Sequence, residues 1–419
     1  MVHDLEVVHA YCCGIDVHKR IMSACVLTPT GKEQKHFSTM TEDILELAAW
    51  LKSHQVPVAA MESTGPYWKS VYNILEEEGF QIVVVNPEHI KSFQRQKTDK
   101  KDAAWIASLL RLGLLKPSFI PSRRERDLRD LSRYRTSLVQ ERTRHIQRVQ
   151  KILEGANIKI ASLLSDVNGL SGRMMLQAIV EGRLTPEEMA SLGSGGLKNT
   201  SQEYTKALTG RIRGTQQWLL AQQLSHIDRL TEEIAQLDAK LEEESKPIPT
   251  FEESLQLLDT IPGIGRQSAM SILIEIGLDM SRFPTAKHLA AWGGLAPGNH
   301  ESAGKRKAEK SRQGNKYLKA VLVQAAHSLH RKKDCHLREQ YQRIQVRRGG
   351  KRAMVAVAHS LLRIIYYILV RKEPYKERGA HYVTEKNKHF RLQRHIRELA
   401  KLGLVIPKEM VDQQLAVSS

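Results

Sequence analysis

The order of strand-like and helix-like segments in the first quarter of the chain restricts the fold more than any other feature. Two short β-rich runs lie at 11–16 and 21–27, a third strand is predicted at 32–38 after a turn, and a helix pattern follows at 41–54. Strand and helix patterns then alternate to about residue 113, through apolar runs at 56–62 and 81–87. Strand runs are short and β-rich between turn residues, whereas helices repeat apolar residues every three or four positions. The order β-β-β-α-β-α-β-α predicts a mixed sheet flanked by helices.

The rest of the chain is predicted to be mostly helical. Residues 122–160 form an Arg-rich helical stretch, with nine arginines and four acidic residues between Ser122 and Gln150. A coiled-coil seam, interrupted once by Gln223, follows at alternating spacings of three and four. Its members are Leu220, Ile227, Leu230, Ile234, Leu237 and Leu241. A helix-rich region at 255–372 and a basic tail complete the chain, so the predicted fold class is α/β plus all-α.

The charge balance points to a polyanionic partner. The 419 residues include 64 Lys and Arg against 46 Asp and Glu, which gives a net charge of +18. Such an excess, spread along a globular chain, is typical of nucleic-acid binding, and an acidic membrane surface is the alternative. The longest apolar stretch, 357–370, contains His359 and Arg363 and is too short to span a bilayer. Without a signal-peptide pattern or zinc-ligand cysteine spacing, we expect a reduced, cytoplasmic protein with no membrane partner.

Four acidic residues occur where strands and helices of the predicted sheet begin or end. Asp16 and Glu62 end two strands, and Asp99 and Asp102 open the next long helix. Strand ends and helix starts at one edge of an α/β sheet can converge into a crevice. A cluster of carboxylates needs a hard cation, and one or two Mg²⁺ ions, set about 3.5–4 Å apart when paired, can stabilise phosphodiester cleavage. The alternative is that these acids are ordinary helix caps and dipole partners.

Residues 255–277 have the form of a helix-hairpin-helix. An apolar helix pattern runs into the sequence Ile-Pro-Gly-Ile-Gly at 261–265, and a second helix pattern follows. Gly263 and Gly265 would let the backbone approach a ligand, and the amides of the second helix would bind phosphate without reading bases. The alternative is a plain helical turn, since Pro-Gly pairs mark turns in proteins generally.

The segment 298–320 places one serine, Ser302, just ahead of a basic run. The cations of this run are Lys305, Arg306, Lys307, Lys310, Arg312, Lys316 and Lys319. From residue types alone, an exposed basic loop that contacts phosphate is the favoured interpretation. No G-x-S-x-G elbow surrounds the serine, and His300 is only weak support for a nearby base.

Three short motifs resemble one known family. The segments "GIDVHK", "MESTGPYW" and "NPEHIKSFQRQKTDKKDA" are similar to the DEDD transposases of insertion sequences, which include Piv-type DNA invertases and bridge-RNA-guided recombinases. The resemblance implies an N-terminal RuvC-like domain with the RNase H fold. Its four catalytic, metal-binding acids would be Asp16, Glu62, Asp99 and Asp102.

The resemblance continues in "GLAPGNHESAGKRK", where the family carries a serine after a GL-x-P loop. That match implies that Ser302 is the nucleophile, whereas Ser271 and Ser311 fit the motif less well. The implied reaction is DNA strand exchange through a covalent phosphoserine, with the basic residues after Ser302 binding the flanking phosphates. The serine and the acids would meet between subunits of a homodimer or tetramer, for which the coiled coil offers a route.

The implied partners are donor and target DNA and a structured noncoding guide RNA, in a bacterial or archaeal cell near its nucleoid. The Arg-rich helix, with Arg123, Arg126 and Arg133, and the tail are suitable RNA surfaces, or simply solvated charged faces. Two other functions stay open: a metal-dependent nuclease of the Holliday-junction type that uses water, and a non-catalytic nucleic-acid-binding protein. We predict four parts: a DEDD catalytic domain at 8–115, Arg-rich helices and coiled coil at 116–249, a helical transposase domain at 250–375, and a basic tail at 376–419.

Overall fold

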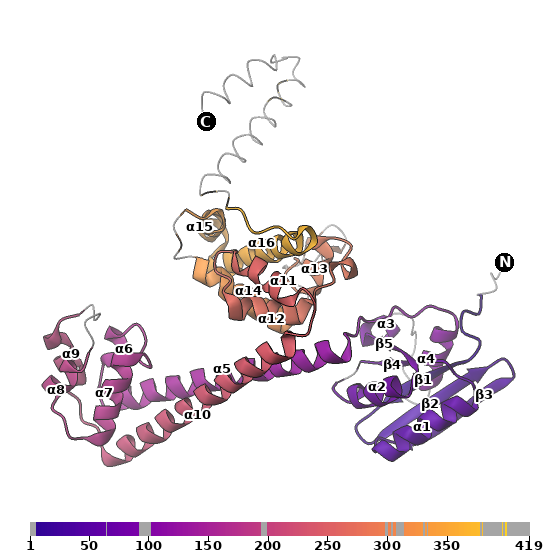
Figure 1. The fold of residues 1–419 in the computed structure, drawn as a ribbon, viewed down its shortest axis with the longest axis horizontal. Coiled ribbons are helices and arrows are strands. Elements are labelled where there is room, and N and C mark those ends of the chain that lie inside the picture. Colours follow the sequence, from indigo (N-terminus) through magenta and orange to yellow (C-terminus); the bar gives the residue numbers. More distant parts are fainter. Residues whose placement is uncertain are drawn as a thin grey trace. The chain divides into compact units, whose positions relative to one another are not determined.

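The computed structural model describes residues 6–63, 65–91, 102–193, 199–297, 314–329 and 334–377, with the single positions 301, 302, 305, 306, 332, 379, 396 and 399. The chain forms two compact units, Met1–Ser122 and Arg123–Ser419 (Figure 1). The finer division of the second unit into coiled coil, transposase domain and tail stays a prediction.

The first unit is built on a five-stranded mixed sheet. Its strands are β1 (Cys12–Val17), β2 (Ile21–Thr28), β3 (Gly31–Ser38), β4 (Val58–Glu62) and β5 (Gln81–Val85), in the order β3-β2-β1-β4-β5. The pairs β1–β2 and β2–β3 are antiparallel, whereas β1–β4 and β4–β5 are parallel. The predicted strands and the mixed sheet are therefore confirmed.

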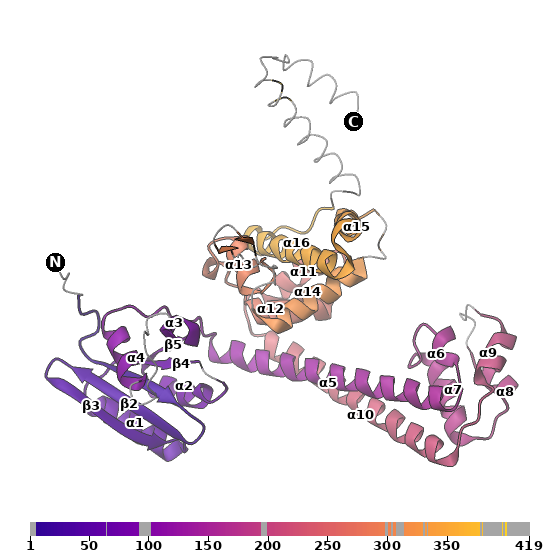
Figure 2. The same cartoon turned by 180° about the vertical axis from the view of Figure 1, so that it is seen from behind.

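Helices cover both faces of this sheet (Figure 2). They are α1 (Thr41–Ser53), α2 (Trp68–Glu77), α3 (Pro87–Lys91) and α4 (Asp102–Arg111). Successive strand residues point to opposite faces, so Cys13 and Ile15 of β1 pack in one core with α1 and α2. On the other face, Cys12 packs in a second core with Ala103 and Ala107 of α4. Burial on both faces explains the nearly continuous apolar runs of β4 and β5.

The second unit begins with a long helical pair. The helices α5 (Arg123–Gly155) and α10 (Gly214–Ser245) lie side by side and antiparallel (Figures 1 and 2). The short helices α6 (Ile160–Leu163), α7 (Leu170–Glu181), α8 (Pro186–Ser191) and α9 (Ser201–Leu208) fill the connection between them. Val149 and Leu153 of α5 share a core with Leu220 and Ile227 of α10.

The predicted coiled-coil seam is real, but its partner lies in the same chain. Leu230 and Ile234 pack on Leu138 of α5, so the seam is buried within one chain and not against a second copy. At the interruption of the seam, the neighbouring residue Leu224 is buried in place of Gln223. The Gln223 side chain forms a hydrogen bond with the His145 ring, with Oε1 2.8 Å from Nδ1. A dimer would therefore need a surface other than this seam.

The remaining helices form a compact bundle. They are α11 (Phe251–Asp259), α12 (Arg266–Ile276), the 3-10 helix η2 (Met280–Arg282), α13 (Ala286–Trp292), α14 (Lys316–Leu329), α15 (His336–Arg348) and α16 (Gly350–Arg371). A two-stranded hairpin, β6 (Glu301–Ser302) and β7 (Lys305–Arg306), lies between α13 and α14 in the sequence. Leu361, Leu362 and Ile365 of α16 are fully buried in the core of the bundle.

The apolar stretch that was expected to be too short for a bilayer is part of the 22-residue helix α16. By length and composition alone, α16 passes as a membrane span, and it is the one helix of the described residues that does so. Half of its most apolar window is buried inside the protein, as is typical of a core helix. The length argument against a span was therefore wrong.

Candidate active site

Three of the four predicted acids come from elements that meet at one end of the sheet. The strands β1 and β4 are parallel neighbours, with Ile15 opposite Met61, so Asp16 and Glu62 lie at the same end of adjacent strands. Asp102 is the first residue of α4, which packs against β1 and β4. The fold thus places these three residues at the same end of the sheet, and their convergence into one catalytic site stays a prediction.

The electrostatics of Asp16 also report this convergence. Burial raises the pKa of the Asp16 carboxyl above its ordinary value, and the negative charges of Asp102 and Glu62 raise it further. The nearby His18 opposes this rise in pKa. The pKa of Asp16 is therefore influenced by both other carboxylates.

A glycine lets α4 approach β1 closely enough to bring Asp102 to the cluster. A Cβ atom on Gly14 would lie 2.2 Å from the carbonyl oxygen of Ala103 and 2.3 Å from the amide nitrogen of Ala107. Both distances are far below van der Waals contact, and both atoms belong to the backbone of α4. Only glycine fits at this position in β1 without moving the helix.

One residue near the acids was missed by the sequence reasoning. The Nε2 atom of His18 lies 3.1 Å from Oδ2 of Asp16, and the His18 side chain is 67% exposed. Its signal was present in the "GIDVHK" motif, two residues after the aspartate. An imidazole at this distance can donate a hydrogen bond to the carboxylate and, when protonated, offset part of its charge.

The donor chemistry of the cluster suits Mg²⁺, which prefers carboxylate oxygens. Among the residues that the structure describes, however, no group of three or more His, Cys, Asp or Glu side chains is close enough to hold a metal ion. The fourth predicted acid, Asp99, lies outside the described residues. Asp16, Glu62 and Asp102 match the ion by residue type alone, and a metal site built from them stays a prediction.

Ser302 lies in a short hairpin of the second unit. Its backbone pairs with Lys305, and Glu301 pairs with Arg306 in the same antiparallel ladder. The positions of the predicted cations Lys307, Lys310 and Arg312 lie outside the described residues, as do the side chains of Ser302, Lys305 and Arg306. Their predicted roles are therefore neither supported nor opposed by side-chain geometry.

The two ends of the Ser302 loop are held together. A Cβ atom on Gly314 would lie only 2.2 Å from the backbone nitrogen of Gly294, and the amide of Asn315 donates to the carbonyl of Trp292 at 3.2 Å. Beside this junction is an open hollow of about 470 Å³ with cationic and aromatic walls. Its lining residues are Arg133, Ala291, Trp292, Gly314, Asn315, Lys316 and Tyr317.

The predicted nucleic-acid contacts of α5 differ in their surroundings. The guanidinium of Arg133 binds the carboxylate of Glu275 through Nε and Nη2, each at 2.8 Å, and lies 4.7 Å from the ring centre of Tyr317. Arg133 is therefore held by Glu275 and Tyr317, where it lines the hollow beside the Ser302 loop junction. Arg123 is exposed and Arg126 half-buried near the start of α5, where an RNA role for them stays a prediction.

The two glycines of the Ile261–Gly265 turn have different surroundings. Helices α11 and α12 flank the turn as expected, and Gly263 has a left-handed φ of 81°. A Cβ atom there would lie 2.7 Å from Oγ of Ser328 and 2.8 Å from the carbonyl oxygen of Ala325, so Gly263 is needed for packing on α14. Gly265 has open space around it and precedes the first turn of α12, where phosphate contact stays a prediction.

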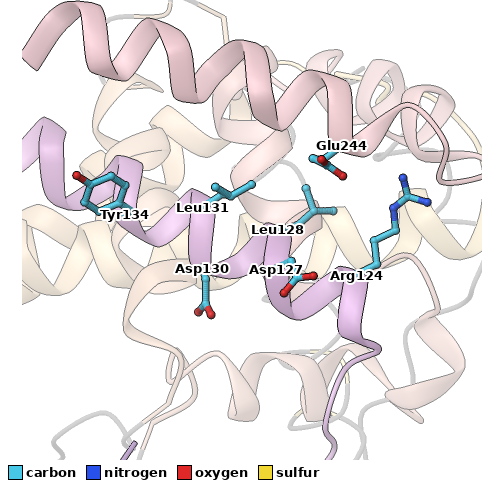
Figure 3. Close-up of a pocket in the computed structure, with 7 residues that line it drawn as sticks. All are labelled: Arg124, Asp127, Leu128, Asp130, Leu131, Tyr134 and Glu244. Atoms are coloured by element: carbon cyan, nitrogen blue, oxygen red, sulfur yellow. The ribbon is translucent and has the colours of Figure 1, made fainter. Parts of the chain in front are cut away.

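A second hollow, also of about 470 Å³, lies between α5 and α10 (Figure 3). Figure 3 shows acidic side chains from both helices along it, together with Arg124 and Tyr134. Its lining residues are Arg124, Asp127, Leu128, Asp130, Leu131, Tyr134 and Glu244. None of the predicted catalytic residues is among them, so this hollow does not coincide with either candidate site.

Acidic residues at one end of a mixed sheet, in a strongly basic chain, are typical of enzymes that act on nucleic acid. Comparison with known families is more specific. Residues 13–158 match the DEDD family of IS110 transposases, and residues 255–342 match the family described as "Transposase IS116/IS110/IS902 family". Together the two matches cover more than half of the chain.

Similar proteins extend the match across most of the sequence. The chain is 24% identical over 378 residues to the pilin gene-inverting protein of Moraxella lacunata, covering 87% of this chain and 97% of that protein. It is also 24% identical over 372 residues to the transposase for insertion sequence element IS1111A of Coxiella burnetii, covering 87% and 90%. The chain belongs to the IS110/IS116/IS902 family of insertion-sequence transposases and is an enzyme of DNA recombination.

Proposed function

We propose that this transposase cuts and rejoins DNA through a covalent bond between Ser302 and a DNA phosphate. The observation that carries the proposal is the gathering of Asp16, Glu62 and Asp102 at one end of β1 and β4. The strand order and the mix of parallel and antiparallel pairs support a RuvC-like, RNase H-type first domain. The match of residues 255–342 to a transposase family supports a functional role for the segment that contains Ser302.

The proposed reaction needs residues that bind metal, residues that bind phosphate and residues that bind bases. Asp16, Glu62 and Asp102, together with Asp99, would hold one or two Mg²⁺ ions. Such ions supply positive charge to phosphate oxygens and to attacking and leaving groups. The phosphates on either side of the reacting bond are bound by the cations that follow Ser302. These cations are Lys305, Arg306, Lys307, Lys310, Arg312 and Lys316. The hollow beside Lys316 adds two aromatic rings, Trp292 and Tyr317, on which an unpaired base can stack.

The cleavage step conserves atoms and charge. The Ser302 hydroxyl gives up its proton, its oxygen bonds to phosphorus, and the leaving strand oxygen takes up a proton and departs as a hydroxyl group. A hydroxyl group of the second strand then attacks the same phosphorus and restores the serine. Because the phosphoester bond is kept in the covalent intermediate, strands can be rejoined without an outside energy source.

We further infer that a structured noncoding RNA guides the enzyme to its DNA sites, acting on an assembly of two or more subunits. The support is physical: a net charge of +18 and an Arg-rich helix of 33 residues. A structured noncoding region beside the coding sequence, with loops complementary to both DNA junctions, is the expected finding. RNA that co-purifies with the protein should carry that sequence, and recombination that needs no RNA would contradict the guided mechanism.

Substitution of Ser302 tests the central claim. We expect Ser302→Ala to lower strand exchange and covalent protein–DNA adducts by about 10³-fold or more, because no other group replaces the nucleophile. Adducts are measured by denaturing gel electrophoresis of labelled DNA after incubation with Mg²⁺. The matched control is Ser311→Ala, a serine of the same basic segment, which should form adducts at the wild-type rate.

One alternative has support of its own, because the acids belong to a compact unit, Met1–Ser122, that does not include the serine. Such a unit can activate water and act as a structure-specific nuclease. Strand cleavage by Ser302→Ala at the wild-type rate, without adducts, would favour this hydrolytic function and overturn the phosphoserine mechanism.

A further inference from the structure

A buried carboxylate contacts Asn315, a residue that follows the segment containing Ser302. Glu275, near the end of α12, is 2% exposed and is the one buried charged residue among those that the structure describes. Its Oε1 accepts a hydrogen bond from Nε of Arg133, and its Oε2 accepts from Nη2 of Arg133, both at 2.8 Å. Oε2 also accepts from Nδ2 of Asn315 at 2.6 Å. A buried charge is tolerated only with such partners, so the side chains of Glu275, Arg133 and Asn315 form one hydrogen-bond network, called the Glu275 network below.

Asn315 connects the Glu275 network to the end of the loop that contains Ser302. While its Nδ2 donates to Glu275, its Oδ1 accepts from the backbone amides of Tyr317 at 3.0 Å and Leu318 at 3.1 Å. These contacts cap the first turn of α14. The backbone amide of Asn315 also donates to the carbonyl of Trp292, which precedes the loop. Asn315 therefore fixes the end of the loop to its beginning and to the next helix.

Arg133 connects the Glu275 network to α5. Arg129, one helical turn earlier, donates from Nε to the carbonyl of Ile274 at 3.0 Å and from Nη2 to the carbonyl of Glu275 at 2.6 Å. Two arginines of α5 thus hold the last turn of α12, and one of them also lies over the ring of Tyr317 in α14. The carboxylate of Glu275 is the point where α5, α12 and the loop exit meet.

We propose that Glu275 is a positioning residue for strand cleavage: it anchors the exit of the Ser302 loop, through Asn315, to α5 and α12. This inference rests on the proposed function of Ser302. A carboxylate is needed because both of its oxygens accept hydrogen bonds. A glutamine in its place has one oxygen and one NH2 group. That NH2 group would face either Nε of Arg133, or both Nη2 of Arg133 and Nδ2 of Asn315, and those hydrogen bonds would be lost.

The test compares Glu275→Gln with Asp238→Asn in the full chain. Asp238 of α10 is the matched control, because Arg135 of α5 also holds it through two guanidinium nitrogens, in the long helical pair and not in the bundle that carries the loop. We expect Glu275→Gln to slow adduct formation at saturating DNA by about 10–100-fold, as expected for a misplaced reacting group, with Kd for DNA unchanged. Asp238→Asn should change neither quantity.

A second measurement reports on the anchor without using the reaction. Backbone hydrogen exchange of peptides from 298–320, measured without DNA, should become faster in Glu275→Gln and stay at the wild-type rate in Asp238→Asn. If Ser302→Ala still forms adducts, the proposed nucleophile is wrong while this measurement still tests the anchor. Unchanged exchange together with an unchanged adduct rate in Glu275→Gln would overturn the anchor itself.

Exchanging the two side-chain types separates this contact from a general loss of packing. Asn315→Asp places a second carboxylate 2.6 Å from Glu275 and should slow adduct formation as strongly as Glu275→Gln. The double variant Glu275→Gln/Asn315→Asp restores one carboxylate and one amide, so we expect it to recover adduct formation relative to either single variant. A double variant whose fold-loss in rate equals the product of the two single fold-losses would show that the residues are not coupled and would overturn the proposal.

Discussion

At the residue scale, the Asp16 carboxylate is unfavourable in the folded protein when no cation is bound. Burial raises its pKa, and the charges of Asp102 and Glu62 add to the rise. An acid whose folded pKa lies above its unfolded pKa contributes stability that is fully present below the unfolded value. That contribution is lost as pH rises through the folded pKa. At neutral pH the charged cluster is therefore a cost that a bound cation would remove.

Asp16→Asn should consequently raise the thermal stability of the metal-free protein at neutral pH, and the difference from wild type should vanish in acid. Mg²⁺ should reverse the order. At a concentration ten times its Kd, it would stabilise the wild type by about 1.4 kcal/mol and leave Asp16→Asn unchanged. Differential scanning calorimetry with and without EDTA measures both effects. A variant less stable than wild type in EDTA at neutral pH would contradict the assignment of Asp16 to a repulsive cluster.

Single residues differ in how far the sequence predicts them. Asp16 and Glu62 stand at strand ends, so a local pattern is enough to suggest that they converge. Glu275 has no such pattern, because its partners Arg133 and Asn315 lie 142 and 40 residues away and only the folded chain brings them together. Ser302 is intermediate: its residue type and neighbours suggest a basic loop, and only the family resemblance suggests a nucleophile.

At the scale of elements, the contact between β1 and α4 decides whether Asp102 reaches the acidic cluster. Gly14→Ala would place a Cβ atom 2.2 Å from the α4 backbone, so we expect the helix to shift and Asp102 to move away from Asp16. The overpacking should lower the free energy of unfolding by about 1–3 kcal/mol. Mg²⁺ affinity and strand cleavage should fall with it.

A glycine of the same sheet provides the control for this prediction. A Cβ atom on Gly31, at the start of β3, would meet no other atom within 4 Å, so Gly31→Ala should keep wild-type Mg²⁺ affinity. Isothermal titration calorimetry with Mg²⁺ measures both variants. Equal affinities in Gly14→Ala, Gly31→Ala and wild type would mean that the approach of α4 does not position a metal ligand.

The elements themselves were predictable where periodicity is strong. Four strands of the sheet and the helices α1, α2 and α4 follow from their apolar patterns, whereas the polar strand β3 was predicted from the turn before it. The short helices α6–α9 were not assigned, and they pack around a core that they share with α5 and α10. The seam of α10 was found, but a pattern of apolar residues does not state which chain supplies the partner helix.

At the scale of the whole molecule, the acids and the serine belong to different compact units of one chain. A reaction that needs both must bring the units together, either within one subunit or between two. The sequence separation of the two sites, Asp102 and Ser302, is compatible with both arrangements. Since the α10 seam is buried on α5, an assembly between subunits would use another surface of the molecule.

Mixing two inactive variants distinguishes these arrangements. Asp16→Asn lacks an acid and Ser302→Ala lacks the serine, so each alone should fail to form adducts. If the acids of one subunit serve the serine of another, a mixed dimer holds one site with both defects and one intact site. With equal amounts of the two variants and random pairing of subunits, about half of the dimers are mixed. Since one of the two sites in each mixed dimer is intact, about a quarter of the sites would be active.

The measurement is adduct formation after the two variants are unfolded, mixed and refolded together, with each variant refolded alone as the control. We expect activity to return in the mixture, because the family resemblance implies a site shared between subunits. In an enzyme that completes its site within one chain, every site in the mixed dimer carries one of the two defects. No activity in a mixture that contains mixed dimers would therefore place acids and serine in the same subunit.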